Sequence, residues 1–286
     1  MRLLRFIASD GAVHLGQRID QDVYPLAEKG VIDLMRPGAI PHRGSPIPAA
    51  GLRLDAPIRD TRKLLALAGN YRKHIVECGF EDPTKEGVVT PQFFWKPSTT
   101  INAPGGTIYI QPNNVFVDWE IELAVIIGRE ARDVSAADAM SYVFGYTIIN
   151  DISERRYNAG IEHRNTRAFD PFFDWLMGKW FDGFAPLGPE IVTADEVPDP
   201  HNLSLKLWVN DKLMQDSNTS FMIFRIPETI AWISSLVTLE PGDIIATGTP
   251  EGIGFARGTP LQPGDRLRGE IEGLGVLENT VERKAV

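Results

Sequence analysis

The chain has 286 residues, of which 43% are hydrophobic and 23% charged, and its net charge at pH 7 is −9. This length suits one large domain with an appendage, or two domains, and the acidic balance argues against a nucleic-acid or anionic-membrane partner. The single cysteine, Cys78, excludes an intrachain disulfide scaffold. The N-terminal stretch is interrupted by charge too early for a signal peptide, and no run approaches 18 apolar residues, so we expect a soluble, cytoplasmic protein.

The start of the chain predicts a small N-terminal α/β unit over residues 1–60, followed by a larger domain over residues 61–286. The runs RLLRFIA and AVHLGQRI flank the turn residues SDG and predict a hairpin. The segment YPLAEKGVIDLM then predicts a short helix, and a Pro/Gly-rich connection follows it.

The rest of the chain is rich in predicted strands. LLALA indicates a short buried strand, and GNYRKHIVE a helical turn after it. Helices are expected in VSAADAMSYVFG and in IPETIAWISSLVTLEPGD, where Pro227 suits a first helical turn and a Pro-Gly stop follows. The other strand candidates are TIYI, WEIELAVIIG, GYTIIND, LSLKLWVND, DIIATG and RLRGEIEGLGVLENTVE. Because the strands outnumber the helices without regular alternation, the pattern predicts a β-rich α+β fold rather than a Rossmann sheet or TIM barrel.

His74 and Glu77 are three positions apart in the predicted helical turn, so they lie on one face of it. A carboxylate beside an imidazole is one way in which a protein makes a general base. From the spacing alone, a plain solvated helix face is the more common interpretation.

Three carboxylates lie at or near the ends of predicted strands. Glu120 and Glu122 project from one face of their strand, which is also the pattern of a strand with one wet side. The strand continues as AVIIG, apolar on both faces, so these carboxylates enter a buried region where a cation or protons must compensate them. Asp151 follows the apolar strand GYTII. Together the three would form an all-oxygen site, which selects Mg²⁺, Mn²⁺ or Ca²⁺ rather than zinc.

A lysine and a Gly-rich loop are further candidate features of a functional site, but each is weak evidence when taken alone. Lys179, in GKWFDGFAPLGP, has the context of an ordinary surface lysine. The loop IIATGTPEGIGF around Thr249 is Gly-rich, and such loops often expose backbone N–H groups that hold an anion. It lacks the Walker lysine and the dinucleotide spacing, so nucleotide binding is not expected.

Several segments resemble the fumarylacetoacetate hydrolase family and follow one another in the order found in that family. The resemblance is in particular to its bacterial acylpyruvase or 2-oxo acid members. The matching segments, from about Leu64 to the C-terminus, are GNYRKHIVE, PQFFWKPSTTINAPG, DWEIELAVIIG, GYTIINDISER, GKWFDGFAPLGPEIVT, VNDKLMQDSNTSFMIF and LEPGDIIATGTPEGIG. The resemblance implies a mixed β-sandwich roll, a homodimer and a divalent-metal site (Mg²⁺, or Mn²⁺ or Ca²⁺) for a small anionic 2-oxo acid. By position it implies metal ligands Glu120, Glu122 and Asp151; catalytic residues His74, Glu77 and Lys179; and substrate contacts Arg155, Thr249 and, in a supporting role, Lys96.

The chain departs from the family pattern at two places. Gly69 stands where members often carry a long side chain, and the segment over residues 154–178 is longer and more charged than expected. Arg156, His163, Arg164 and Arg167 in this segment are expected either to contact a distal substrate group or to line a dimer contact.

The resemblance favours hydrolysis of a C–C bond in a β-diketo acid such as an acylpyruvate or fumarylpyruvate. In this interpretation His74, oriented by Glu77, activates water, Lys179 stabilises the enolate, and residues 78–91 form a cover. The same parts would serve decarboxylation of oxaloacetate, or isomerisation or hydration of an unsaturated 2-oxo acid. A non-catalytic, metal-stabilised small-molecule binder would keep the three carboxylates and have no use for the dyad.

Overall fold

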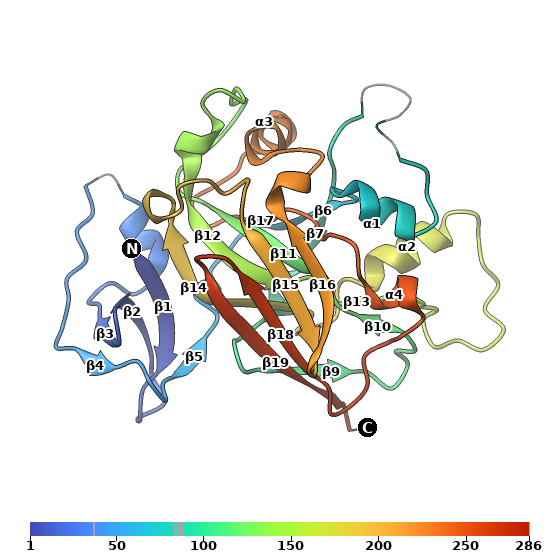
Figure 1. The fold of residues 1–286 in the computed structure, drawn as a ribbon, viewed down its shortest axis with the longest axis horizontal. Helices are drawn as coiled ribbons and strands as arrows, with labels where there is room; N and C mark the ends of the chain where they lie inside the picture. Colours follow the sequence, from blue (N-terminus) through green and yellow to red (C-terminus); the bar gives the residue numbers. More distant parts are fainter. Residues whose placement is uncertain (37, 83, 85–88, 286) are drawn as a thin grey trace.

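The computed structural model describes residues 1–36, 38–82, 84 and 89–285 (Figure 1). The expected cover over residues 78–91 includes residues 83 and 85–88, which lie outside the described residues. The strands are β1 (Arg2–Ile7), β2 (Val13–Ile19), β3 (Asp22–Pro25), β4 (Ile47–Pro48), β5 (Arg53–Asp55), β6 (Leu64–Ala68), β7 (Gln92–Lys96), β8 (Ile101–Asn102), β9 (Thr107–Ile110), β10 (Val117–Asp118), β11 (Ile121–Ile127), β12 (Val143–Asn150), β13 (Ser153–Glu154), β14 (Ala185–Thr193), β15 (Ser204–Val209), β16 (Lys212–Asn218), β17 (Ile244–Ala246), β18 (Arg266–Ile271) and β19 (Gly275–Arg283). The helices are α1 (Arg72–Glu77), α2 (Asp170–Met177), α3 (Ile226–Leu236) and α4 (Gly254–Arg257), with 3-10 turns η1 (Val31–Met35), η2 (Ser98–Thr100), η3 (Ala139–Tyr142), η4 (Ala194–Glu196) and η5 (Thr219–Phe221).

Two sheets form a sandwich, which confirms the predicted β-rich α+β fold (Figure 1). The large sheet has the order β4-β3-β2-β1-β14-β12-β11-β17-β6-β7, and the smaller one the order β16-β15-β18-β19-β9. One face of β11, with Trp119 just before it, packs against Leu205 and Leu207 of β15 in the core between the sheets. The other face of β11 joins a second apolar cluster. Because β11 is buried on both faces, polar side chains at its start are held in the interior.

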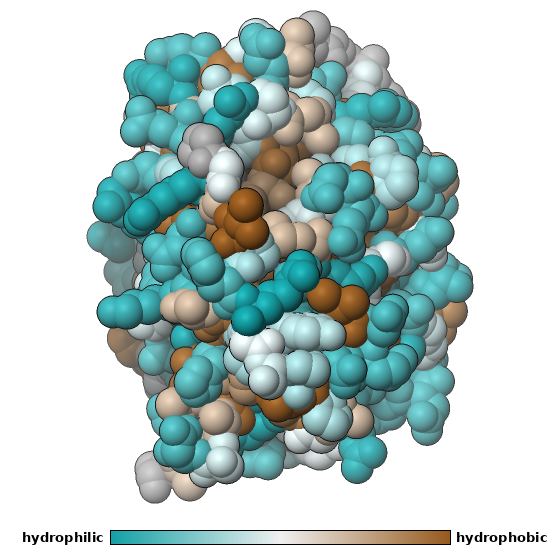
Figure 2. All heavy atoms as spheres, turned by 90° about the vertical axis from the view of Figure 1, so that its left-hand side faces the viewer, coloured by the Kyte–Doolittle hydropathy of each residue, from teal (hydrophilic) through white to brown (hydrophobic). Residues whose placement is uncertain are grey.

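The predicted N-terminal hairpin is confirmed, since β1 and β2 pair antiparallel from Arg2↔Arg18 to Ile7↔Val13. The predicted helix after it is wrong in its first half: Tyr24 and Pro25 end β3, and only the 3-10 turn η1 follows. Pairing of β3 with β2 outweighs the weak local helical pattern. The side of the molecule that carries these strands is mostly hydrophilic with scattered apolar side chains (Figure 2).

The helix predicted in IPETIAWISSLVTLEPGD is confirmed as α3, with Pro227 in its first turn. The helix predicted in VSAADAMSYVFG is wrong. Only the turn η3 forms there, and Val143 already begins β12, which is paired on both sides by β11 and β14. Within the described residues, no helix has the length and apolar character needed to cross a membrane.

Candidate active site

The three acidic residues converge where β11 begins and β12 ends. Glu120 directly precedes β11, Glu122 lies inside it, and Asp151 follows β12. The backbone N–H of Asp151 donates to the carbonyl of Glu120 at 2.9 Å, and the side chain of Asn150 accepts the N–H of Glu120 at 2.8 Å. These bonds fix the two strand ends together, and one carboxylate oxygen from each acidic residue lies within 4.8 Å of the others.

This cluster fits a divalent cation. Oxygen ligands lie about 2.1 Å from Mg²⁺ and about 2.4 Å from Ca²⁺, so opposite ligands are separated by about 4 to 5 Å. The separations of up to 4.8 Å are of this size. The three side chains are buried and offer only hard oxygen donors, as the sequence predicts.

Two buried lysines lie among these carboxylates. Lys179 Nζ donates to Glu120 Oε2 at 2.6 Å and to Asp151 Oδ2 at 2.7 Å. Lys96 donates to the other oxygen of Asp151 and, at 3.3 Å, to the carbonyl of Ile152. Asp151 is therefore held by an ammonium group on each side.

The charge in the cluster is unevenly shared. Burial raises the pKa of Glu122 well above its usual value, and the neighbouring Asp151 and Glu120 raise it further. Burial also disfavours the charge on Glu120, but Arg155, Lys179 and His74 outweigh it and hold its pKa below the usual value. In the metal-free protein Glu122 therefore favours its protonated form, and a divalent cation would stabilise its charged form instead.

The predicted dyad forms on α1. His74 Nδ1 lies 3.2 Å from Glu77 Oε1, and both side chains are largely buried. Burial lowers the pKa of His74, but Cys78, Glu77 and Glu120 outweigh it and raise the pKa to about 9. Because the charge of Glu120 helps to raise this pKa, the His74–Glu77 pair lies near the acidic cluster.

The Gly-rich loop after β17 holds the protein's own carboxylates with its backbone N–H groups. Gly248 donates to Glu122 at 2.7 Å, and Gly252 to Glu77 at 2.8 Å. Gly254 donates to Asp118 at 2.6 Å. The expected anion-binding loop therefore binds a cluster ligand, the dyad glutamate and a third carboxylate inside the chain.

Thr249 lies in the same loop with its hydroxyl engaged on both sides. The hydroxyl donates to the carbonyl of Ile121 at 2.9 Å and accepts from Gln215 Nε2 at 2.9 Å. Gln215 also accepts the N–H of Ile121 at 3.0 Å. Thr249 thus ties the loop to the first residue of β11, next to the cluster.

Arg155 joins the acidic cluster to a carboxylate that the sequence analysis missed. Its Nε donates to Asp118 Oδ2 at 3.0 Å, and a terminal nitrogen donates to Glu120 Oε1. Asp118 stands two positions before Glu120 in the motif VDWEIE and is fully buried. Its place beside the motif was a signal, but two of its partners, Gly254 and Phe255, come from a loop far along the chain.

The other charged residues of the segment over 154–178 lie outside this cluster. Arg164 donates to Asp174 at 2.8 Å, and Arg167 pairs with Asp170 at 2.9 Å, so both are bound to α2. The guanidinium of Arg156 stacks on the ring of Phe116, and His163 is exposed beside Glu162.

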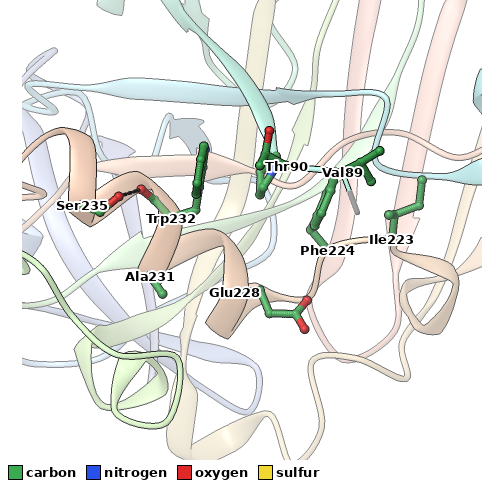
Figure 3. A pocket seen from close by; sticks show the side chains of 9 residues that line it. Val89, Thr90, Ile223, Phe224, Glu228, Ala231, Trp232 and Ser235 are labelled. Atoms are coloured by element: carbon green, nitrogen blue, oxygen red, sulfur yellow. Dashed lines mark hydrogen bonds between the residues drawn. The ribbon is translucent and has the colours of Figure 1, made fainter. Parts of the chain in front are cut away.

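A separate groove of 510 Å³ lies along α3 (Figure 3). It is lined by Val89, Thr90, Pro91, Ile223, Phe224, Glu228, Ala231, Trp232 and Ser235. None of these is a predicted metal-ligating, catalytic or substrate-binding residue, although Val89, Thr90 and Pro91 belong to the expected cover over residues 78–91.

Comparison with known proteins decides the family. The family described as fumarylacetoacetate (FAA) hydrolase C-terminal matches residues 63–282. The chain belongs to the fumarylacetoacetate hydrolase family. It is 42% identical over 237 residues to the mitochondrial oxaloacetate tautomerase FAHD2B of Bos taurus, which covers 82% of this chain and 71% of the relative.

Solved structures of family members extend this comparison. The 5-carboxymethyl-2-hydroxymuconate delta-isomerase of Mycobacterium smegmatis is 35% identical with a TM-score of 0.78, over 99% of this chain and 100% of that one. The maleylpyruvate hydrolase of Sphingobium sp. SYK-6, in complex with manganese(II) ion and pyruvate, is 33% identical with a TM-score of 0.76, over 100% of both chains. A tautomerase, an isomerase and a hydrolase are therefore all similar to this member of the family.

Proposed function

We propose that this protein catalyses keto–enol conversion of a small 2-oxo diacid of the oxaloacetate type, with a divalent cation bound by Glu120, Glu122 and Asp151. The observation that carries the proposal is the His74–Glu77 pair beside the acidic cluster. The likeness to oxaloacetate tautomerases, at 42% identity for the bovine one, supports the same reaction.

When bound, the cation would act as a Lewis acid toward the oxygens of the 2-oxo acid. His74 then moves a proton at the carbon next to the 2-oxo group. Glu77 contacts Nδ1, and Nε2, which has no hydrogen-bond partner among the described residues, is the nitrogen that would make this transfer. In the direction of ketonisation, the C=C electron pair takes the proton of protonated His74 to form the new C–H bond, and the enolate oxygen becomes the 2-oxo oxygen; enolisation is the reverse of this step. Lys179 stabilises the enolate oxygen, and Arg155 binds an anionic group of the substrate.

Hydrolysis of an acylpyruvate is the second candidate, because the maleylpyruvate hydrolase is similar over the whole chain. The dyad would take a proton from water, and the resulting hydroxide would add to the carbonyl distal to the 2-oxo acid. The C–C bond then breaks, and the leaving pyruvate enolate takes up a proton. Both reactions pass through an enolate that Lys179 stabilises, so they differ in the need for water.

The test is turnover of a substrate panel by the pure protein with Mg²⁺ or Mn²⁺. Enol oxaloacetate would lose its ultraviolet absorbance faster than in buffer if the proposal is right, and His74→Ala would slow this by about 100-fold, the usual contribution of a general base. His42→Ala, which changes an exposed histidine paired with Glu28, is the matched control.

Cleavage of acetylpyruvate or fumarylpyruvate without tautomerisation would favour the hydrolase instead. Release of pyruvate from oxaloacetate that survives His74→Ala would indicate a decarboxylase, and no turnover of any compound would contradict the proposal.

A further inference from the structure

Asp118 is a fully buried carboxylate whose acceptor positions are all used. Oδ1 accepts the N–H groups of Trp119 at 2.8 Å and Gly254 at 2.6 Å. Oδ2 accepts the N–H of Phe255 at 3.0 Å and Nε of Arg155 at 3.0 Å. Four donors converge on one carboxylate, so its position is fixed from several directions.

Arg155 is held at one end and extends into the acidic cluster with the other. Its side chain is 10% exposed. Nε faces Asp118, and one terminal nitrogen faces Glu120. The other terminal nitrogen, Nη1, has no hydrogen-bond partner among the described residues. A guanidinium that is fixed through Nε presents its two terminal groups in a set direction, which suits a carboxylate.

We propose that Asp118 is a positioning residue for substrate: it holds Nε of Arg155 so that the terminal nitrogens of this arginine face the acidic cluster and bind an oxygen of the 2-oxo acid. The inference rests on the proposed function, since it assumes that such an acid binds at this cluster. Asp118 acts only through Arg155 and the loop around Gly254, and it does not touch the substrate itself.

The positioning role of Asp118 follows from the negative charge of the cluster, which attracts the guanidinium of Arg155. Within the cluster three carboxylates lie close together, and a guanidinium free of Asp118 would turn fully onto them. Both of its terminal nitrogens would then donate to Glu120 and the neighbouring carboxylates, and neither would remain for the substrate. Asp118 offers a competing partner at Nε, and the backbone N–H groups of Trp119, Gly254 and Phe255 hold its carboxylate in place.

The experiment compares Asp118→Asn with Glu154→Gln. Asn keeps the shape of Asp but turns an N–H₂ group toward two of the four donors. Glu154 is a matched control on the paired strand β13: it is also buried and accepts the backbone N–H groups of Val115, Phe116 and Arg156, at 2.7 to 3.0 Å. Calorimetry with Mn²⁺-saturated protein gives the affinity for oxalate, and Mn²⁺ binding is measured separately.

We expect Asp118→Asn to lose oxalate affinity tenfold or more, the worth of a charge-assisted hydrogen bond, with Mn²⁺ affinity within about threefold of the wild type. Glu154→Gln is expected to keep the wild-type affinities for oxalate and for Mn²⁺. In an Arg155→Ala background, Asp118→Asn should cause no further loss of oxalate affinity. An equal loss in that background, or the same loss in Glu154→Gln, would overturn the inference.

A second variant tests the same contact without changing Asp118. Arg155→Lys keeps the positive charge and removes Nε, so it is expected to lose as much oxalate affinity as Arg155→Ala. Full affinity in Arg155→Lys would overturn the positioning role even if Asp118→Asn does not fold. Failure of the wild-type protein to bind oxalate with Mn²⁺ is a different result, because it would overturn the proposed function and this inference with it.

Discussion

At the scale of single residues, the ammonium group of Lys179 lies between two oxygens that a divalent cation would use. It donates to Glu120 and Asp151, and Lys96 donates to Asp151 from the other side. In the metal-free protein these lysines supply the positive charge that keeps buried carboxylates tolerable. Cation binding must therefore rearrange contacts that already exist, rather than fill an uncharged space.

Lys179→Met is expected to destabilise the metal-free protein by roughly 3–5 kcal/mol, because two buried carboxylates lose a charged partner. Mn²⁺ should then raise the melting temperature of the variant by more than that of the wild type, since the ion replaces the missing charge. Differential scanning fluorimetry with EDTA or Mn²⁺ measures both effects.

Lys63→Met is the matched control for this prediction. Lys63 Nζ also donates to two carboxylates, Glu240 at 2.7 Å and Asp243 at 2.9 Å, but these lie outside the acidic cluster. The variant should be destabilised without any extra recovery by Mn²⁺. An equal recovery in both variants would show that Lys179 does not substitute for the ion.

His74 is expected to be protonated at neutral pH in the metal-free protein, because its pKa is raised to about 9. A pKa raised on folding stabilises the protein fully below the ordinary value of about 6.5. That stability, about 3 kcal/mol, is lost as the pH rises through about 9. NMR titration of the His74 ring tests the pKa. Glu77→Gln should move it down toward 6.5, and an unchanged pKa would mean that Glu77 is not its partner.

At the scale of elements, the loop after β17 connects parts of the site that are far apart in sequence. Gly248 binds Glu122 on β11, Gly252 binds Glu77 on α1, and Gly254 binds Asp118 on β10. Each contact joins a backbone N–H of the loop to a side-chain carboxylate, so one loop holds Glu77 and Glu122 at the same time.

Gly252→Ala is expected to disturb this loop more than an ordinary glycine substitution. Gly252 has a φ of +105°, and a Cβ there would lie 2.2 Å from the carbonyl oxygen of Met214. Gly258→Ala is the control, with a φ of +66° and no atom within 4 Å of its Cβ, so it should cost only about 1 kcal/mol of backbone strain. Denaturant unfolding should show the larger loss of stability for Gly252→Ala, and the rate of the proposed keto–enol conversion should fall as well. Equal effects would mean that the loop adapts freely.

These elements also show which parts of the site the sequence predicts. Glu120, Glu122 and Asp151 could be brought together in advance because they mark the facing ends of two strands that pair as neighbours. The contacts of Asp118 could not, since Gly254 lies 136 positions away and only the completed sandwich brings it there. The failed helix over VSAADAMSYVFG has the same cause: pairing on both sides of β12 outweighs a local pattern.

At the scale of the whole molecule, the N-terminal strands extend the large sheet, because β1 pairs with β14. One apolar cluster contains residues from both predicted parts of the chain: Leu3, Leu15 and Val31 from residues 1–60, and Leu187 and Ile191 from residues 61–286. The family match begins only at residue 63, but this cluster lies on both sides of that boundary. We therefore propose that residues 1–60 are needed for folding of the catalytic part.

Deletion of residues 1–60 tests this dependence. Leu3, Leu15 and Val31 contribute about 2 kcal/mol each when buried, so their loss removes about 6 kcal/mol, a large part of the 5–15 kcal/mol that stabilises a typical protein. The edge of β14 also loses its partner strand β1, which favours aggregation. We expect the chain over 61–286 to be insoluble or to melt without a cooperative transition.

Protein whose backbone is cleaved at the exposed Gly51, so that both pieces remain present, is the control and should stay folded. A soluble 61–286 chain with the wild-type melting temperature and rate would show that the catalytic part folds alone.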